Sequence, residues 1–424
     1  MFIYRNLIPE ILKHLKKKTG IAVIGPRRIG KSVILQKIVK QIGGLSKSLI
    51  YNLDDLDLRT RISNNPNFFS QEIIASGCKY LIIDEAQKLP KIFEQIKTLI
   101  DQKQCKVILT GSSSLQIRQK SAETFGGRIR MLRAFPFSLA EIYQTRSFIE
   151  SLLNKKKLTM TWLKTEQKRL WQIKLIWENG WKNYLLTGFL PEVFLDKNRE
   201  NKFYLLKDFI QNYLEKDILL LSRVLQIEDF RAVLSQFAYQ NGQILNTVSL
   251  STESGMARKT INNYLSLLKQ TFLIYQISAV TGKKRSSMFK MPKIYFFDMG
   301  VANYLLGLSS FEQIKVANRQ GALTENFVLT QLIPHTENLA LPTRVAYWQN
   351  YQGQEVDFIV EKGMDKFPIE VTLADSIKQE KINNLSAFME LFNLTTGILL
   401  YRGELRQISV GSKTIFAIPL WMWV

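Results

Sequence analysis

A lysine and a hydroxyl-bearing residue end a glycine-containing turn near the beginning of the sequence. Residues 25–32 read Gly-Pro-Arg-Arg-Ile-Gly-Lys-Ser and fit the Walker A pattern G-x-x-x-x-G-K-[ST]. The apolar run before them is typical of a buried strand, and residues 33–40 carry apolar side chains at helical spacing. In such a unit, glycine lets successive N–H groups point at a triphosphate, and the helix N-terminus adds partial positive charge.

This turn is therefore a candidate ATP-binding site. We expect Lys31 to contact the β- and γ-phosphates and the Ser32 hydroxyl to bind Mg²⁺. The alternative is a strand-to-helix turn that binds no ligand, and the flanking strand and helix argue against it. The residues predicted to form the site are Gly25, Pro26, Arg27, Arg28, Ile29, Gly30, Lys31 and Ser32.

A second predicted strand, residues 79–84, ends in two carboxylates. An apolar strand that ends in Asp-Glu is typical of the other half of a P-loop ATPase site, the Walker B segment. We expect Asp84 to hold Mg²⁺ and Glu85 to orient the attacking water or accept its proton. Glu85 favours hydrolysis over binding alone, because binding needs only the first carboxylate.

Three further residues are candidates for contact with the transferred phosphate. Residues 106–111 are predicted to form a strand whose end lies beside the γ-phosphate in a parallel sheet. Thr110 or Ser112 is therefore a candidate γ-phosphate sensor, and a helix N-cap is the alternative for the serine run. Arg128 could stabilise transition-state charge in its own subunit or in a second copy of the chain, which makes a homo-oligomer a candidate assembly. The alternative for Arg128 is a structural or phosphate-contacting arginine.

Five segments, in this order, resemble one known family. They read Gly-Pro-Arg-Arg-Ile-Gly-Lys-Ser (25–32), Leu-Ile-Ile-Asp-Glu-Ala-Gln-Lys-Leu-Pro (81–90), Leu-Thr-Gly-Ser-Ser-Ser (109–114), Gly-Gly-Arg (126–128) and Pro-Phe-Ser-Leu-Ala-Glu (136–141). Together they look like the bacterial and archaeal AAA-type ATPases that carry a C-terminal region of unknown function. Residues 292–300 are similar to a further signature of that family. The resemblance implies an ATP-binding AAA core with the nucleotide-site residues named above, and it implies no biological role.

The charge balance indicates a polyanionic partner. The 424 residues include 58 Lys and Arg against 36 Asp and Glu, a net charge of +22. Such an excess favours nucleic acid or an anionic membrane surface. The alternative is that the charge only reflects a generally basic proteome. The length predicts two to four domains, and the apolar content is that of a globular protein.

Several classes of protein are disfavoured by composition. Cys78 and Cys105 are too few for a disulfide framework and indicate a reducing compartment. The sequence has two histidines, His14 and His335, and this small number argues against a His-based zinc site or a Ser-His-Asp triad. No apolar run reaches the roughly 18 residues of a membrane span. We therefore expect a cytoplasmic protein with no membrane span.

The middle of the chain is predicted to be helical and then to form a winged helix. Residues 142–199 are helical and aromatic, which predicts a lid packed beside the nucleotide, and helices at 203–221 and 229–240 follow. Residues 252–268 have the pattern of a helix-turn-helix, and strands at 272–280 and 293–297 enclose a basic tip. The candidate DNA contacts are Arg258, Lys259, Asn262 and Asn263 on the second helix and Lys283, Lys284 and Arg285 at the tip. A packing module without DNA is the alternative.

The last region resembles the restriction-endonuclease-like fold with its PD-(D/E)XK site. Glu325 on a predicted helix, Asp357 on a strand and Glu370 on the next strand form a possible second metal site. Thr372 stands where that site carries a lysine, which removes an electrostatic contribution to catalysis. Lys362, Lys366 or Lys378 could substitute. We therefore expect a degenerate, nuclease-like binding domain, and an active nuclease is the alternative.

These observations predict an α/β protein of four parts: a P-loop AAA-type ATPase domain with a parallel sheet (1–145), a helical lid (146–225), a winged-helix domain (226–315) and a restriction-endonuclease-like domain (316–424). The expected function is Mg²⁺-dependent ATP binding and hydrolysis that controls a DNA-binding or partner-binding C-terminal region. An ATP-gated protein-interaction switch without nucleic acid and an ATP-coupled nuclease are the alternatives.

Overall fold

The computed structural model describes residues 2–17, 20–111, 127–211, 227–280, 291–339 and 341–424. The chain forms two compact units. The N-terminal unit contains Phe2–Phe135 together with Leu267–Leu273, and the C-terminal unit contains Pro136–Ser266 and Ile274–Val424. In the described ranges, no helix is both long enough and apolar enough to cross a membrane. The four-part division stays a prediction.

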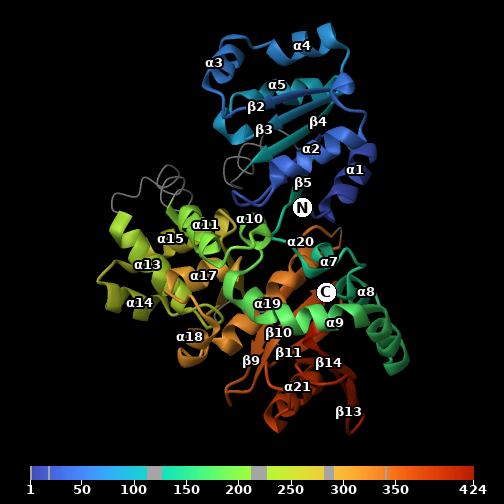
Figure 1. Cartoon of the computed structure of the whole chain (residues 1–424), viewed down its shortest axis with the longest axis vertical. Coiled ribbons are helices and arrows are strands. Elements are labelled where there is room, and N and C mark those ends of the chain that lie inside the picture. The colour runs from blue at the N-terminus through green and yellow to red at the C-terminus, as the bar shows by residue number, and fades with distance from the viewer. Residues whose placement is uncertain (1, 18–19, 112–126, 212–226, 281–290, 340) are drawn as a thin grey trace. The chain divides into compact units, whose positions relative to one another are not determined.

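Five parallel strands form the sheet of the N-terminal unit (Figure 1, blue to cyan). They are β1 (Gly20–Ile24), β2 (Ser48–Asn52), β3 (Tyr80–Asp84), β4 (Lys106–Gly111) and β5 (Ile129–Arg133), in the order β2-β3-β4-β1-β5. Because the strands are parallel, their carboxyl ends meet at one edge. The carboxyl ends of β1, β3 and β4, at or near which the predicted nucleotide-site residues of the described ranges lie, are therefore at the same edge of the sheet.

Helices cover both faces of this sheet (Figure 1). They are α1 (Leu7–Lys17), α2 (Lys31–Gln41), α3 (Leu56–Asn64), α4 (Phe68–Ser76) and α5 (Ile92–Asp101). Apolar residues of α3, α4 and α5 form one buried cluster with alternate residues of the strands, such as Leu81 and Ile83. α2 lies on the other face, because the β1–β2 crossover runs along the sheet in the opposite direction to the β3–β4 crossover, which contains α5. α1 packs against α2 on that face.

The observed strands differ from the sequence-based expectation in two places. Residues 129–133, for which no strand was predicted, form edge strand β5. The single strand predicted for 272–280 is two strands, β6 (Ile274–Ile277) and β7 (Ala279–Val280), which belong to different sheets. Phe272, just before β6, adopts a left-handed backbone conformation (φ 65°) and is buried in the core of the N-terminal unit.

The C-terminal unit begins with helices, as predicted for this stretch. They are α7 (Leu139–Ile142), α8 (Phe148–Leu153), α9 (Met160–Thr187), α10 (Pro191–Leu195) and α11 (Arg199–Phe209). α9 is 28 residues long and ends at Gly188, whose φ of 70° suits glycine. Of the aromatic residues of α9, Trp177 and Trp181 are buried and Trp177 packs against Phe327, whereas Trp171 is 56% exposed.

Three helices and two antiparallel strands follow in the same unit. They are α13 (Ile227–Tyr239), α14 (Thr247–Ser254), α15 (Arg258–Gln270), β6 and β8 (Lys293–Phe296), except that the end of α15, from Leu267, belongs to the N-terminal unit. Gly255, in a left-handed conformation (φ 67°), ends α14 and turns the chain toward α15. Ile244, between α13 and α14, forms an isolated antiparallel bridge with Lys293 of β8. The basic tip between the strands, with Lys283, Lys284 and Arg285, lies outside the described residues.

A mixed seven-stranded sheet ends the chain, in the order β13-β14-β12-β11-β10-β9-β7 (Figure 1, orange to red). Its strands are β7, β9 (Thr343–Gln349), β10 (Glu355–Lys362), β11 (Asp365–Val371), β12 (Thr396–Tyr401), β13 (Arg406–Val410) and β14 (Lys413–Pro419). The other helices are α17 (Met299–Leu305), α18 (Phe311–Val316), α19 (Gln320–Leu332), α20 (Pro334–Glu337) and α21 (Gln379–Leu391). β9, β10 and β11 are antiparallel neighbours, and β12 is parallel to β11 after the α21 crossover.

A buried carboxylate joins two segments of the C-terminal unit. Asp298 caps α17 by accepting hydrogen bonds from the N–H groups of Gly300 and Val301, and it also accepts one from Phe189. Burial raises the pKa of Asp298 to about 6, although these N–H groups act in the opposite direction. A Cβ at Gly188 would lie 2.1 Å from a carboxylate oxygen of Asp298, so the close approach requires glycine there.

The raised pKa of Asp298 predicts a pH-dependent stability. The folded state binds more protons than the unfolded state between the unfolded pKa of about 3.9 and the folded pKa of about 6. The contribution of this group is therefore fully present at low pH and is lost as pH rises through 6. We expect the difference in unfolding free energy between wild type and Asp298→Asn to fall from pH 4 to pH 7. Denaturant titrations test this, and two parallel pH profiles would contradict it.

Candidate functional site

The glycine-containing turn lies between β1 and α2, as the sequence predicts. Two of its residues, Arg28 (φ 57°) and Gly30 (φ 86°), have left-handed backbone conformations. A Cβ at Gly25 would lie 2.7 Å from the carbonyl oxygen of Ala134, the residue after β5. The first glycine is therefore required for close packing of the turn against the neighbouring strand, and the second for the sharp entry into α2.

Lys31 lies inside this turn. Its Nζ donates hydrogen bonds to the carbonyl oxygens of Gly25 (2.9 Å) and Pro26 (2.7 Å), and the side chain is 5% exposed. Main-chain carbonyls satisfy a buried ammonium group without neutralising its charge. The turn thus holds a positive charge at the N-terminus of α2, where the helix already favours anions.

The carboxylate of Asp84 connects the ends of three elements. It accepts a hydrogen bond at Oδ2 from the Ser32 hydroxyl (2.8 Å), at the start of α2, and one at Oδ1 from the Thr110 hydroxyl of β4. A serine hydroxyl and a carboxylate oxygen in contact are hard oxygen ligands of the kind Mg²⁺ prefers. The donor set therefore fits the predicted metal, and Thr110 is placed to orient Asp84. Ser112 lies outside the described residues.

Glu85 has an unusual conformation for a non-glycine residue (φ 56°). Its N–H donates to Thr110 Oγ1 (3.1 Å), and its carboxylate accepts a hydrogen bond from Gln87 Nε2 (2.5 Å). Such backbone strain persists only where the surroundings impose it and is frequent at active sites. The strain and the Gln87 contact give Glu85 a defined direction beside Asp84.

Arg128 lies at the wrong end of the sheet for a contact with the phosphates of its own subunit. It precedes β5, whose first residue pairs with Gly20 at the amino end of β1, and it forms an ion pair with Asp101. The turn that follows β1 is at the opposite end, four strand residues or about 13 Å away. Within one chain, a structural role for Arg128, as the partner of Asp101, therefore fits better than a contact with the transferred phosphate.

A different arginine is found at the carboxyl end of β5. Arg133 pairs in register with Ile24, the last residue before the turn. Its guanidinium lies between the rings of Phe135 (4.9 Å) and Phe272 (4.3 Å), measured to the ring centroids. Arg133 was not among the residues predicted from the sequence, because its place beside Ile24 follows only from the pairing of β5 with β1.

Two of the three acids predicted as a second metal site meet around a lysine. Asp357 of β10 and Glu370 of β11 are buried, and each accepts a backbone N–H from the other strand. Lys381 of α21 lies between them, with Nζ 2.5 Å from Glu370 Oε1 and 3.7 Å from Asp357 Oδ2. This lysine comes from a helix and is none of the three sequence-based candidates for the missing lysine, Lys362, Lys366 and Lys378.

Glu325 of α19 also has a cationic neighbour. It accepts a hydrogen bond from the Tyr295 hydroxyl (2.8 Å) and lies 3.5 Å from Lys293 Nζ. Burial, together with the charge of Asp357, raises the pKa of Glu325 to about 7, and the same causes raise the pKa of Glu370 well above its ordinary value. Among the described residues, no three acidic, histidine or cysteine side chains are arranged to hold a metal ion. Lysines instead lie beside these acids.

The polar face of α15 is exposed. Arg258, Lys259, Asn262 and Asn263 are all exposed, whereas Ile261 and Leu268 are buried. Arg258 is also held near α14, because its Nε donates to Thr247 Oγ1 (3.3 Å). The helix therefore presents the predicted DNA contacts to solvent on one side and packs with the other.

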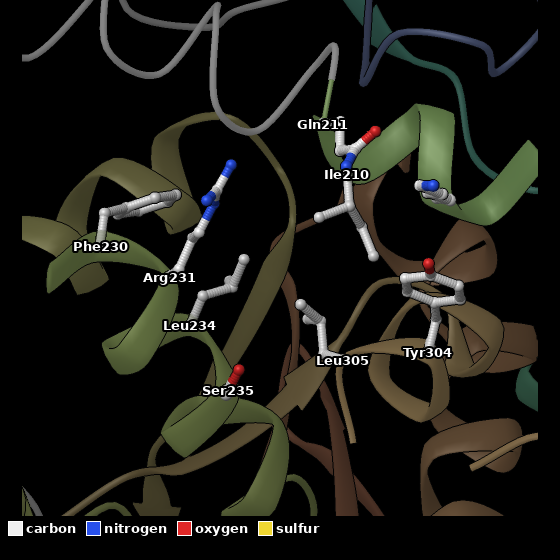
Figure 2. Close-up of a pocket in the computed structure, with 9 residues that line it drawn as sticks. Ile210, Gln211, Phe230, Arg231, Leu234, Ser235, Tyr304 and Leu305 are labelled. Carbon is white, nitrogen blue, oxygen red and sulfur yellow. The ribbon is translucent and has the colours of Figure 1, made fainter. Parts of the chain in front are cut away.

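A separate cavity of about 280 Å³ lies in the C-terminal unit between α11, α13 and α17. Figure 2 shows Leu234 and Leu305 facing each other across it. None of the residues that line it is a predicted site residue. The cavity is therefore distinct from the sites predicted from the sequence.

Comparisons with known proteins agree with the geometry of the N-terminal unit. Residues 17–143 match the AAA domain family, and residues 178–312 and 320–423 match two domains of unknown function, DUF8612 and DUF4143. The AAA match supports the prediction of a P-loop ATPase domain in the N-terminal region.

Two relatives extend along most of the chain. An uncharacterized protein of Mycobacterium tuberculosis is 23% identical over 98% of this chain and 83% of its own length. An uncharacterized protein of Haemophilus influenzae is 21% identical over 97% of both chains. Among solved structures, a Walker-type ATPase of Pyrococcus abyssi is similar with a TM-score of 0.46 and 16% identity, covering 72% of this chain and 96% of that chain.

Proposed function

We propose that this chain hydrolyses ATP at the turn between β1 and α2 and that its nucleotide state controls a DNA-binding C-terminal region. The hydrogen bond between Ser32 and Asp84 carries the first part, because it joins the two sequence segments that a P-loop ATPase needs at one point. Steady-state ATP hydrolysis by the purified chain, measured with and without DNA, tests both parts.

The residues of the site have separate roles in this proposal. Lys31 exchanges its carbonyl partners in the turn for phosphate oxygens, and the N–H groups of the turn bind the same anion. Ser32 and Asp84 hold Mg²⁺, which when bound neutralises charge on the phosphates. Glu85 orients the water that attacks the γ-phosphate, with Thr110 fixing its backbone and Gln87 its carboxylate.

The DNA-binding part of the proposal is supported by the order of elements around α15. A helix-turn-helix is followed by two antiparallel strands, and the Ile244–Lys293 bridge adds a third short strand position. This is the arrangement we expect of a winged helix, with α15 as the helix that enters the groove. The exposed Arg258 and Lys259 and the net charge of +22 fit a polyanion.

Removing the charges on α15 is expected to weaken DNA binding. The double variant Arg258→Ala/Lys259→Ala should bind duplex DNA about tenfold more weakly at low salt and lower the log–log salt slope by about two, because each phosphate contact contributes about 0.9. Lys164→Ala/Lys168→Ala, which removes two exposed charges from α9, is the matched control. Fluorescence anisotropy at several salt concentrations gives both quantities. Equal losses of DNA affinity in the two double variants would favour the alternative in which the positive charge only reflects a basic proteome. If wild type binds no DNA, the ATP-gated protein-interaction switch is the better proposal.

The position of Lys381 favours a second candidate function, cleavage of nucleic acid, although no three acidic, histidine or cysteine side chains of the described residues are arranged to hold a metal ion. A protonated lysine between the carboxylates of adjacent strands can stabilise the charge that develops on a phosphate. Burial lowers the pKa of Lys381, but Asp357 and Glu370 raise it more, so the lysine stays charged. The ion pairs equally suit a degenerate site that holds its strands together without cleavage.

Plasmid nicking in Mg²⁺ or Mn²⁺ separates these two interpretations. If the site is active, Asp357→Ala and Lys381→Met should each reduce nicking about a hundredfold or more. Lys378→Met, which removes an exposed lysine just before α21, should leave it unchanged. Absence of nicking by wild type would leave the degenerate binding domain as the better proposal.

A further inference from the structure

An arginine from outside the glycine-containing turn is buried against it. Arg5 precedes α1 and is 4% exposed. Its Nη1 donates a hydrogen bond to the carbonyl oxygen of Ile29 in the turn (2.9 Å), and its Nη2 donates one to the carbonyl oxygen of Phe135 after β5 (2.5 Å). A Cβ placed on Gly30 would lie 3.5 Å from Nη1. One guanidinium thus links the turn to the segment beyond the edge strand.

The segment that carries Arg5 is fastened along α2. Lys37 Nζ lies 3.9 Å from the centre of the Phe2 ring, and the Tyr4 hydroxyl accepts a hydrogen bond from Gln41 (3.4 Å). The carbonyl oxygen of Arg5 also accepts the N–H of Ile8 at the start of α1 (3.1 Å). These contacts fix the backbone of Arg5 relative to the helix that the turn begins.

The contact with Ile29 determines which way a peptide group in the turn faces. In a trans peptide the C=O and the following N–H point in opposite directions, so a carbonyl held by Arg5 directs the N–H of Gly30 away from Arg5. The residues on either side of Ile29, Arg28 and Gly30, have left-handed conformations that need support from their surroundings. We propose that Arg5 is a positioning residue that holds the turn in the conformation that receives the triphosphate.

This inference rests on the proposed nucleotide site, and ATP affinity tests it. Arg5→Ala should raise the dissociation constant for Mg·ATP about tenfold to a hundredfold, because it leaves two buried carbonyl groups without their donor. Arg5→Lys keeps the positive charge but not the two guanidinium N–H groups that reach both carbonyl oxygens. It should lose less affinity for Mg·ATP than Arg5→Ala does. Free guanidinium at millimolar concentration should restore part of the affinity of Arg5→Ala and none of that of Lys31→Ala. Lys13→Ala, which removes an exposed side chain of α1 that is not part of these contacts, is the control and should bind ATP as wild type does.

Circular dichroism and thermal unfolding without nucleotide establish that each variant is folded. If Arg5→Ala does not fold, Arg5→Lys with the same titration decides the question. A folded Arg5→Ala variant with unchanged affinity would overturn the inference, as would an equal loss of affinity in Lys13→Ala. If wild type itself binds no ATP, the proposed nucleotide site fails together with this inference, whereas normal binding by wild type and Arg5→Ala alike removes only the role of Arg5.

Discussion

Lys31→Ala is expected to abolish ATP hydrolysis, with a loss of at least about a hundredfold in kcat/KM. The ammonium group is buried in the turn and donates hydrogen bonds to two carbonyl groups there, which places it where phosphate oxygens would arrive. Removing a preorganised cation from a water-poor phosphate site costs transition-state stabilisation of this size. Steady-state phosphate release at several ATP concentrations measures the loss.

Lys40→Ala is the control for this variant, because Lys40 is an exposed lysine at the other end of the same helix. It should leave kcat/KM unchanged within about twofold, since surface charges distant from a site contribute little. Comparable losses in the two variants would mean that the charge of α2 as a whole, and not the position of Lys31, supports hydrolysis.

Glu85→Gln is expected to separate ATP binding from hydrolysis. The amide keeps the size of the carboxylate but cannot accept a proton from water, so kcat should fall about a hundredfold or more. Affinity for Mg·ATP should change little, because Ser32, Asp84 and the turn remain. Single-turnover hydrolysis and equilibrium titration on the same preparation provide the two quantities.

Glu94→Gln, an exposed acid on α5, is the control for Glu85→Gln and should hydrolyse ATP as wild type does. Full turnover by Glu85→Gln would show that the strained backbone at this position serves structure and not catalysis. Loss of ATP binding by Glu85→Gln would instead point to a role of this carboxylate in holding the nucleotide site together.

The N-terminal unit was largely predictable because its signals are local. The apolar runs of β1 and β3 are short and bounded, and the residues that end them are those that bind phosphate and metal in such sites. Edge strand β5 was not predictable in the same way. Its first three residues are only half-buried and include Arg130, so the stretch lacks the apolar run of a central strand.

The residues that sequence analysis missed are those placed by tertiary structure. Lys381 reaches the carboxylates of two strands from a helix that follows them, and no spacing in the sequence indicates this. Arg5 contacts Ile29 across 24 residues and Phe135 across 130. The prediction of one continuous strand over 272–280 was wrong for a similar reason. Its last residues form β7, which pairs with β9, a strand far along the chain.

The central claim is that Ser32 and Asp84 hold a magnesium ion with ATP in the turn beside Lys31. Equilibrium titration of ATP, with Mg²⁺ and with a chelator, tests it most directly in wild type and Asp84→Asn. The account predicts one ATP per chain, tighter binding in Mg²⁺ for wild type, and no gain from Mg²⁺ in Asp84→Asn. Saturable binding that Mg²⁺ strengthens equally in both proteins, or no saturable binding by wild type, would contradict it.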